Sequence, residues 1–298
     1  MRLLVRAVVA AGLVAGARIL QTNEEGWAEQ NVRLFNDALR AAGHDVVLSC
    51  PAYNSSNHGM SDKEPRPSQA PCHYNSCPES FAGTGANASR PDLNWVSSYA
   101  VTAARHGIER TGPRLWGGAP PDLVVVGPGV GPSTALGNRR SSAVGAACYA
   151  ARRAKVPAVL FAGANRRGHP WNEPPALDSA VFARVAANVT QALVDAGPPP
   201  LLPRGVYLNV NMPRVAAGGC ARADDVRFYL TRTGSGFASA RDVAWCRGTR
   251  LPTEIWIQNQ IPCAVSLTVV DALDLSTAPA KKQKLVLDRL RPLLSCLP

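Results

Sequence analysis

Arg18-Ile-Leu-Gln-Thr-Asn-Glu-Glu-Gly26 decides the fold class, because a short apolar strand pattern runs there into a polar turn. After the turn, Val32, Phe35 and Leu39 recur at helical spacing. A strand that leads through a turn into an amphipathic helix is typical of α/β proteins. Ligands in such proteins bind outside the carboxyl ends of the strands. We therefore expect a ligand site at residues 23–26.

The alternation of strands and helices continues along the chain. Because strands and helices take turns, we expect an α/β fold with a doubly wound, largely parallel sheet in one domain over residues 18–298. We expect the helix after residue 177 to be capped by Asp178 or Ser179, and residues 244–298 to form a C-terminal arm. The expected strands are 18–22, 45–49, 122–127, 157–161, 206–212, 226–231 and 265–270, and the later helices are about 141–153, 178–196 and 281–297.

A polar segment at residues 54–94 interrupts this pattern. It is rich in Ser, Pro, Gly and Asn, which predicts an exposed insertion loop, and such a loop could fold over the site as a lid. The segment carries the sequons at Asn54 and Asn87, and a third sequon lies at Asn188. These sequons predict a glycoprotein if the chain enters the secretory pathway.

The first 17 residues have the pattern of a signal peptide. Arg2 and Arg6 precede an apolar run, and small residues at 15–17 suit cleavage. A membrane anchor is the alternative, but the run is shorter than the roughly 20 residues that span a bilayer. We therefore expect no membrane span and a secreted protein that begins near Arg18.

The cysteines agree with secretion. Eight are present, and an even set in a secreted chain is typical of disulfides. Cys72 could pair with Cys77 across a short loop, and Cys220 with Cys246, although spacing does not fix the connectivity. A zinc site is the weaker reading, since no CxxC pair is present and His73 is typical of a loop residue.

The net positive charge of the chain indicates which kinds of molecule it binds. The formal net charge is +11, and it falls to +9 when Arg2 and Arg6 leave with the leader. Anionic small molecules or an acidic polymer are natural partners of such a chain. We expect no specific nucleic-acid binding, because the basic residues are scattered and no aromatic residues alternate with them in a stripe.

Two features could supply chemistry at the expected site. The adjacent carboxylates of Glu24 and Glu25 can hold a hard divalent cation, although acidic residues also simply suit a helix N-terminus. A glycine-rich turn at residues 128–133 is followed by a helix start at Ser141. Backbone N–H groups at a helix start bind anions.

In this order, the segments resemble the SurE survival-protein phosphatases and nucleotidases, and in particular a secreted fungal acid-phosphatase branch. Residues 19–27 resemble the strand and "NDDGW" opening of that family, and residues 51–56 its second site loop. Residues 122–147 resemble the long third motif, and residues 208–213, 231–234 and 267–278 the strands that complete the family's subdomain. The resemblance implies a Rossmann-like core with a C-terminal β-arm and helix.

The resemblance also implies a metal-dependent phosphomonoesterase that hydrolyses small phosphorylated substrates such as nucleotides, usually as a homo-oligomer. Carried over by position, the catalytic residues are Glu24 and Glu25, which with Ser56 are also the metal ligands. Gly129 stands at the position of an expected asparagine ligand. The implied substrate-binding residues are Asn23, Gly26, Gly131, Ser133, Ser141 and Ser142.

The site departs from the family pattern in ways that bear on the metal. Glutamate in place of aspartate lengthens each carboxylate arm by about 1.5 Å, whereas magnesium demands near-ideal octahedral geometry. Ser133 replaces a second asparagine, and Ser141-Ser142-Ala143 replaces the "SGT" turn. The expected cofactor is a divalent ion, magnesium or manganese first, with calcium or cobalt as further candidates.

Two functions remain open from the sequence. One is a secreted acid phosphatase or 5'/3'-nucleotidase that uses the metal. The other is a repurposed or catalytically silent member that binds a small or anionic ligand in the same cleft. Histidines offer little to either, since His106 is typical of a helix end, and His58 near Ser56 is a general-acid candidate that also suits an exposed loop.

Overall fold

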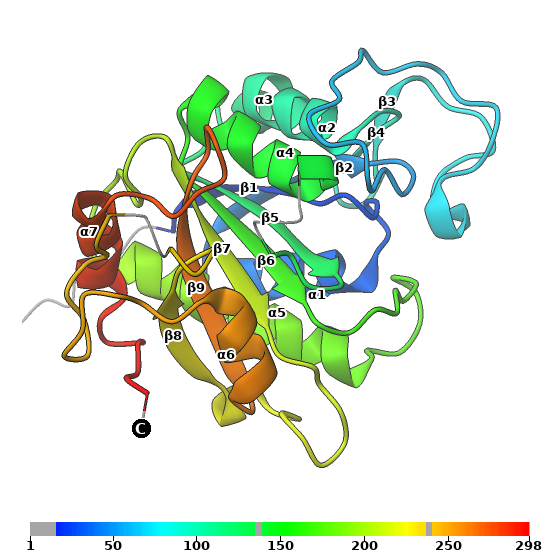
Figure 1. The fold of residues 1–298 in the computed structure, drawn as a ribbon. Coiled ribbons are helices and arrows are strands. Elements are labelled where there is room, and N and C mark those ends of the chain that lie inside the picture. Colours follow the sequence, from blue (N-terminus) through cyan, green and yellow to red (C-terminus); the bar gives the residue numbers. More distant parts are fainter. Residues whose placement is uncertain (1–15, 135–138, 237–239, 298) are drawn as a thin grey trace, which may run out of the picture.

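The computed structural model describes residues 16–134, 139–236 and 240–297 (Figure 1). The predicted leader therefore lies almost wholly outside the described residues. At its boundary, the Ala17 backbone N–H donates to Nδ1 of His44 at 3.2 Å, and Ala17 packs into the core.

Nine strands of the described residues form one sheet in the order β3-β4-β2-β1-β5-β6-β7-β9-β8. The six strands from β4 to β7 in this order are mutually parallel, whereas β3 and β9 run antiparallel to β4 and β7. The fold prediction of a largely parallel α/β sheet is confirmed. The strands are β1 Arg18–Thr22, β2 Asp45–Pro51, β3 Thr84–Ala86, β4 Leu93–Val96, β5 Leu123–Val130, β6 Ala158–Gly163, β7 Val206–Met212, β8 Arg227–Thr231 and β9 Ala264–Asp271.

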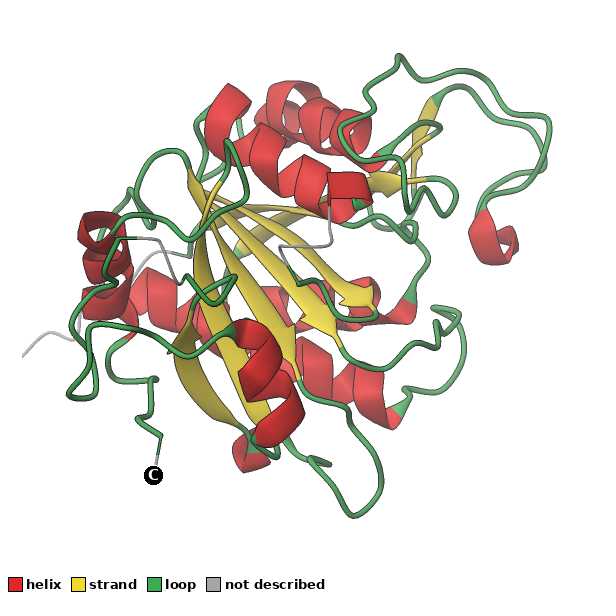
Figure 2. Ribbon diagram, in the orientation of Figure 1, coloured by secondary structure: helices red, strands yellow, loops and turns green. Residues whose placement is uncertain are grey.

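Helices cover both faces of the sheet (Figure 2). One face packs on α1, α5 and α7, with Phe35 edge-on to Phe161, and the other packs on α2 and α4. Consecutive residues such as Ile19 and Leu20 therefore enter opposite cores, as expected for strands buried on both sides. The helices are α1 Gln30–Ala41, α2 Ala100–His106, α3 Gly112–Leu115, α4 Ser142–Cys148, α5 Leu177–Asp195, α6 Glu254–Gln260 and α7 Ala280–Leu290, and π-helical turns over Gly107–Thr111 and Tyr149–Ala154 extend α2 and α4.

Two helix ends differ from the predictions. The N-cap of α5 is Ala176, which has no capping side chain, so the expected cap by Asp178 or Ser179 is wrong. Helix α7 ends at Leu290 instead of 297. Pro292 follows within two residues of this end, and a proline inside the helix would lack the N–H of the hydrogen-bond ladder.

Residues 244–298 are not an appended arm. Strand β9 lies between β7 and β8, and seven of its eight residues are buried. Helix α7 packs on α5 through Val286, Leu287 and Leu290. The C-terminal part of the chain is thus a component of the main core, because the apolar faces of β9 and α7 need the same partners as the rest of the sheet.

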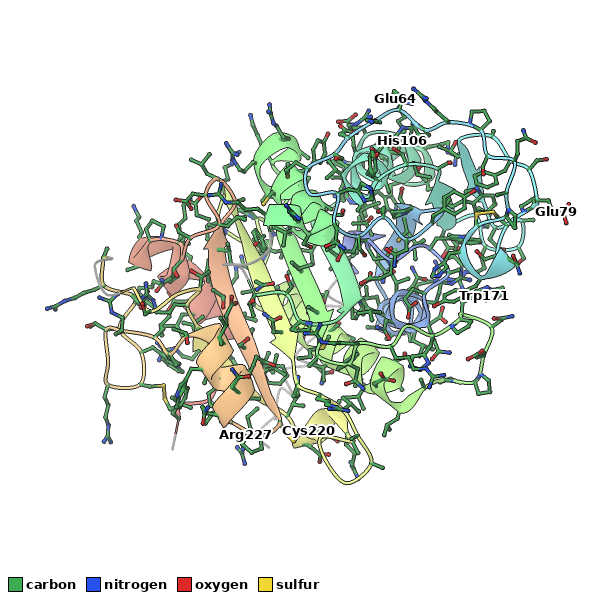
Figure 3. The ribbon with its side chains drawn as sticks, turned by 45° about the vertical axis from the view of Figure 1, so that its right-hand side comes forward. Glu64, Glu79, His106, Trp171, Cys220 and Arg227 are labelled. Atoms are coloured by element: carbon green, nitrogen blue, oxygen red, sulfur yellow. A yellow bond between two sulfur atoms is a disulfide. The ribbon has the colours of Figure 1, made fainter. Side chains whose placement is uncertain are left out.

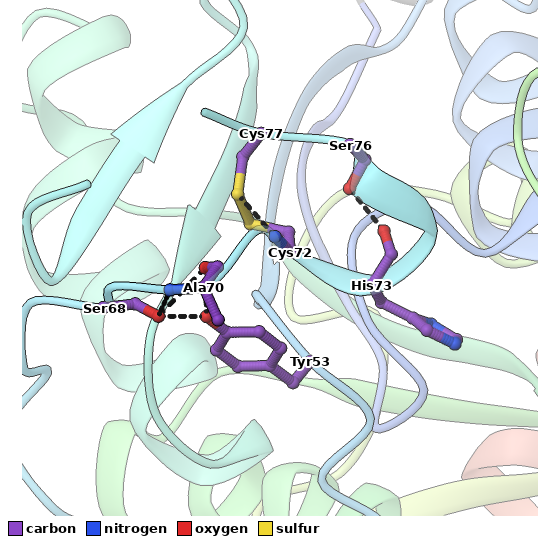
Figure 4. The surroundings of a disulfide bond; sticks show 7 residues. All are labelled: Tyr53, Ser68, Ala70, Cys72, His73, Ser76 and Cys77. Atoms are coloured by element: carbon purple, nitrogen blue, oxygen red, sulfur yellow. Dashed lines mark hydrogen bonds between the residues drawn. A yellow bond between two sulfur atoms is a disulfide. The ribbon is translucent and has the colours of Figure 1, made fainter. Parts of the chain in front are cut away.

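The predicted loop at residues 54–94 contains strand β3 at Thr84–Ala86 and ends before Leu93, where β4 begins, so part of it belongs to the sheet. The cause is apolar contact: the Trp95 ring of β4 lies 4.8 Å from that of Trp27. The remaining loop is tied by the Cys72–Cys77 disulfide and by hydrogen bonds among Tyr53, Ser68 and Ala70 (Figure 4).

Six cysteines form disulfides, and the Cys72–Cys77 prediction is confirmed. The pairing of Cys220 with Cys246 is wrong, since the other bonds join Cys220 to Cys263 and Cys246 to Cys296. The reason is topological. Strands β8 and β9 are paired, and Arg227 lies opposite Ala264, which brings the segment before β8 next to the residue before β9.

The two remaining cysteines, Cys50 and Cys148, are buried thiols, which gives a labelling prediction. Burial raises the pKa of Cys148 to about 12 and that of Cys50 well above its usual range. Because the thiolate is the reactive form, iodoacetamide at pH 8 should leave the native chain unlabelled. Mass spectrometry should find two labels after denaturation alone and eight after denaturation with reduction. More than two labels without reduction would contradict the disulfide pattern.

Candidate active site

The structure brings the predicted acids, Ser56 and Gly129 into one pocket at the carboxyl ends of the parallel strands. Glu24 and Glu25 follow β1, Gly129 lies at the end of β5, and Ser56 lies in the loop after β2. The cavity has a volume of about 410 Å³. Its position is the one expected for a ligand site in an open α/β sheet.

Glu24 is held at the first turn of α4. Its Oε2 accepts hydrogen bonds from the Ala143 N–H at 2.9 Å and from Oγ of Ser141 at 3.3 Å. Burial raises the pKa of Glu24, and these hydrogen bonds oppose the increase. The same N–H that an anionic ligand could use is therefore occupied by a carboxylate of the chain itself.

Glu25 is the more deeply buried of the two acids. Its Oε1 accepts from the Val130 N–H at 2.6 Å, whereas its buried Oε2 has no hydrogen-bond partner among the described residues. Burial, and then the charge of Glu24, raise the pKa of Glu25 to about 8. An oxygen in this state needs either a proton or a cation beside it.

Glu25 and Gly129 fit each other. A β-carbon built on Gly129 would lie 3.1 Å from Oε1 of Glu25, tighter than ordinary van der Waals contact. The longer arm of glutamate therefore places its carboxylate where a side chain at position 129 would begin. This explains why two departures from the family pattern, the longer acid and the glycine, occur together in this chain.

The donors present suit a hard divalent cation in kind. Two carboxylates and the Ser56 hydroxyl line the pocket, and all are oxygen ligands. Oε2 of Glu25 lacks any other partner in the described part of the chain. No group of three or more histidine, cysteine, aspartate or glutamate side chains gathers there or elsewhere among the described residues. A cation would therefore rest on two carboxylates and neutral oxygens.

Two arginines also line the pocket, and sequence reasoning missed both. Arg140 precedes α4 and Arg166 follows β6, so they come from different loops at the same edge of the sheet. Neither forms an ion pair with a described carboxylate. Their position after strand ends was the available signal, because the expected sheet already placed those loops at the site.

Three predicted substrate-binding residues do not line the pocket. Asn23 exchanges two hydrogen bonds with the backbone of Gly26, and Gly26 adopts a φ of +117° that favours glycine. Ser142 is fully buried, and its hydroxyl donates to the Ser55 carbonyl at 2.6 Å. The polar groups of Asn23 and Ser142 are already hydrogen-bonded within the protein. These residues therefore shape the turns that carry Glu24 and Ser141.

Gly131, Ser133 and Ser141 do line the pocket. The loop of Ser133 is anchored by β7, because the Ser133 N–H donates to Oδ1 of Asn211 at 2.7 Å and Nδ2 of Asn209 donates to the Ser133 carbonyl at 2.8 Å. The two asparagines are fully buried beneath the loop. They position the ligand-facing loop without lining the pocket.

The histidines lie outside the pocket. Nδ1 of His58 donates to the Ser55 and Ser56 carbonyls, and its ring contacts Tyr99. His106 is buried at the end of α2, and its Nε2 lies 3.7 Å from a carboxylate oxygen of Glu64. Figure 3 labels both residues. Burial lowers the pKa of His106. The His58 ring is thus held by its own loop, whereas Nε2 of His106 has no hydrogen-bond partner among the described residues.

Among the described residues, no helix is both long enough and apolar enough to cross a bilayer.

The fold and the pocket define an open-sheet α/β protein with paired carboxylates and two arginines at its strand ends. A family model described as survival protein SurE matches residues 19–238. The chain belongs to the SurE family. Its structure is similar to that of the SurE protein from Aquifex aeolicus, with a TM-score of 0.59 and 19% identity over 86% of this chain and 93% of the other.

One relative carries a functional name. The chain is 26% identical over 228 residues to an acid phosphatase of Yarrowia lipolytica (strain CLIB 122 / E 150), a match that covers 73% of this chain. This chain spans 63% of the length of that relative. The family resemblance inferred from the sequence is confirmed.

Proposed function

We propose that the protein is a metal-dependent phosphomonoesterase, an acid phosphatase or 5'/3'-nucleotidase acting on nucleotides or other small phosphates. SurE family membership and the acid-phosphatase relative support a phosphoric monoester hydrolase. The observation that carries the proposal is the pocket itself, which joins the buried carboxylate of Glu25 and the half-buried carboxylate of Glu24 to two arginines that lack carboxylate partners among the described residues.

In this proposal Glu24, Glu25 and Ser56 hold a divalent cation, with magnesium or manganese as first candidates and calcium or cobalt next. When bound, such an ion polarises a phosphoryl group and lowers the pKa of a bound water. Arg140 and Arg166 bind the phosphoryl oxygens, since guanidinium groups suit phosphate geometry. The loop at Gly131 and Ser133 and the Ser141 hydroxyl orient the substrate, while Oε2 of Glu25, which has no other partner among the described residues, carries a proton only when no cation is bound.

One observation favours the second candidate, a repurposed or silent member that binds a small anionic ligand. The Glu24 carboxylate accepts the Ala143 N–H and so competes with a phosphate for the start of α4. In this case Arg140 and Arg166 bind a ligand that is not turned over. The two functions differ in turnover and share the pocket.

A metal titration should separate them. After chelation, the purified chain should hydrolyse p-nitrophenyl phosphate and nucleoside 5'- and 3'-monophosphates at least about tenfold faster when magnesium or manganese is restored. Cobalt and calcium complete the series, and potassium at matched ionic strength is the control. Turnover that is indifferent to chelation, or absent with all four metals, speaks against the metal-dependent enzyme.

We also propose that the protein is secreted and glycosylated. Three disulfides and the acid-phosphatase relative are consistent with secretion, and Asn54 is exposed beside the pocket. The family also makes a homo-oligomer our expectation for the assembly. Intact mass of the chain recovered from the medium of a eukaryotic host, before and after glycosidase, tests the start near Arg18 and the glycans. Light scattering tests the assembly.

A further inference from the structure

A second cavity, of about 360 Å³, lies along α4 next to the candidate active site. We call it the α4 groove. Ser141 lines both cavities, and the two preceding arginines divide between them, with Arg139 in the groove and Arg140 in the active-site pocket. The far wall of the groove is the loop after β9 at residues 272–275. The groove thus begins where the candidate active site ends.

The groove follows one face of a helix. Ser141, Val144, Gly145, Cys148 and Arg152 line it, and their spacing of three and four residues puts them on a single helical stripe. At 1.5 Å per residue, Ser141 and Cys148 are about 10 Å apart along α4, and Arg152 lies beyond them in the π-helical turn Tyr149–Ala154. A ligand that follows this stripe is therefore extended, and one of its ends lies at the active site.

The middle of the groove is apolar and open to solvent. Met60 and Leu273 are 55% and 69% exposed, and few large apolar side chains of the described residues are as exposed. Val144 and Leu275 continue the apolar lining. Exposed apolar side chains that gather in a groove indicate a binding surface.

The far end of the groove is cationic. Arg152 and Arg153 are exposed and form no ion pair with a described carboxylate. The single acidic residue in the lining, Asp274, lies in the field of Arg139 at the near end. The charge of the far pair therefore remains available to an anion.

We propose that the α4 groove binds the organic part of the substrate, which is a phosphomonoester with an extended apolar chain and a second anionic group at its end. The proposal rests on the proposed phosphatase function. The phosphate lies in the active-site pocket, the apolar chain passes Val144 and Leu273, and the distal anion pairs with Arg152 and Arg153. The order of these groups in the ligand matches the order of the surfaces along the helix, from the active-site pocket through the apolar middle to the cationic far end.

Non-hydrolysable phosphonates test the groove by calorimetry on the full chain. ω-Phosphonodecanoate should bind at least about tenfold tighter than decylphosphonate, because only the former carries the distal anion. The double variant Arg152→Ala/Arg153→Ala should lose this preference. Arg184→Ala, an exposed arginine on α5, is the matched control and should keep it. Leu273→Ser should weaken both long probes and leave ethylphosphonate unchanged.

Equal affinity for the two long probes, or a preference that survives in the double variant, overturns the groove proposal. The phosphatase proposal is tested separately with ethyl phosphate, which is too short to reach the groove. If the protein hydrolyses ethyl phosphate but binds the two long phosphonates equally, only the groove proposal fails. If the protein prefers ω-phosphonodecanoate but hydrolyses no ethyl phosphate, the groove is supported as a binding site and the phosphatase proposal fails.

Discussion

Glu25→Gln is expected to reduce kcat/KM for a phosphomonoester by roughly a hundredfold or more. Glu25 supplies the buried Oε2 that lacks a partner among the described residues, so the variant loses a carboxylate that the proposed function assigns to the cation. Losses of several kcal/mol in transition-state stabilisation correspond to such factors. The measurement is steady-state kinetics beside the parent, with circular dichroism as a check of folding.

Glu29→Gln is the matched control for this loss. Glu29 is also a buried glutamate with a pKa raised by burial, but it does not line the pocket. Its Oε2 accepts from the Tyr74 hydroxyl at 3.2 Å. Activity of Glu29→Gln within a few-fold of the parent is expected. A Glu25→Gln variant that retains activity to the same degree would remove Glu25 from the mechanism.

Glu25→Gln should also stabilise the metal-free protein, relative to the parent, by an amount that increases with pH. Below about pH 4.5 Glu25 is protonated in both the folded and the unfolded state. Between that pH and about 8 the folded state keeps the proton and the unfolded state releases it, so the parent loses stability. Glutamine does not titrate. The melting temperature of Glu25→Gln relative to the parent should therefore grow by several degrees from pH 5 to pH 8.

Gly129→Asn alone is expected to lower activity, whereas the combined change Glu24→Asp, Glu25→Asp and Gly129→Asn should raise metal-dependent turnover. A side chain at 129 meets the Glu25 carboxylate at 3.1 Å, and a shorter acid leaves room for it. Because the residues share one space, their effects should couple by about 0.5–3 kcal/mol instead of adding. Kinetics and calorimetric metal affinity of the single, double and triple variants measure the coupling.

Gly129→Ala serves as the control, since it adds the β-carbon without a new ligand. Gly129→Ala should lose part of the activity that Gly129→Asn loses. Shortening the two acids should restore its activity only by relieving the contact between residue 129 and the Glu25 carboxylate. Additive effects in the Asn series, or unchanged metal affinity in the triple variant, would show that the ligand set does not limit this site.

The fold could be predicted where local pattern and burial agree. Strands β1 and β7 have the predicted bounds, and β2 and β9 differ from prediction by at most two residues at an end. The C-terminal arm and the Cys220 pairing were wrong for one reason. The neighbour of β8 in the sheet is set by a long-range pairing, in which Arg227 lies opposite Ala264. No local sequence pattern encodes that pairing.

The site was predictable to the level of loops. The rule for strand ends placed Glu24, Ser56 and Gly129 together, because it depends only on topology. It could not say which side chains face the pocket. Arg166 faces it and Ser142 does not, a difference set by the turn geometry at each loop.

The place of β9 has a consequence for synthesis on the ribosome. Strand β8 leaves the ribosome before β9, the strand with which it forms its ladder among the described residues, because β9 follows it in sequence and separates it from β7. Until residue 271 has emerged, the backbone groups of β8 have no ladder to join and β7 keeps an open edge. An open edge invites pairing with other chains. The nascent protein is therefore most exposed to aggregation late in translation, and chaperone demand should peak there rather than during assembly of the first strands.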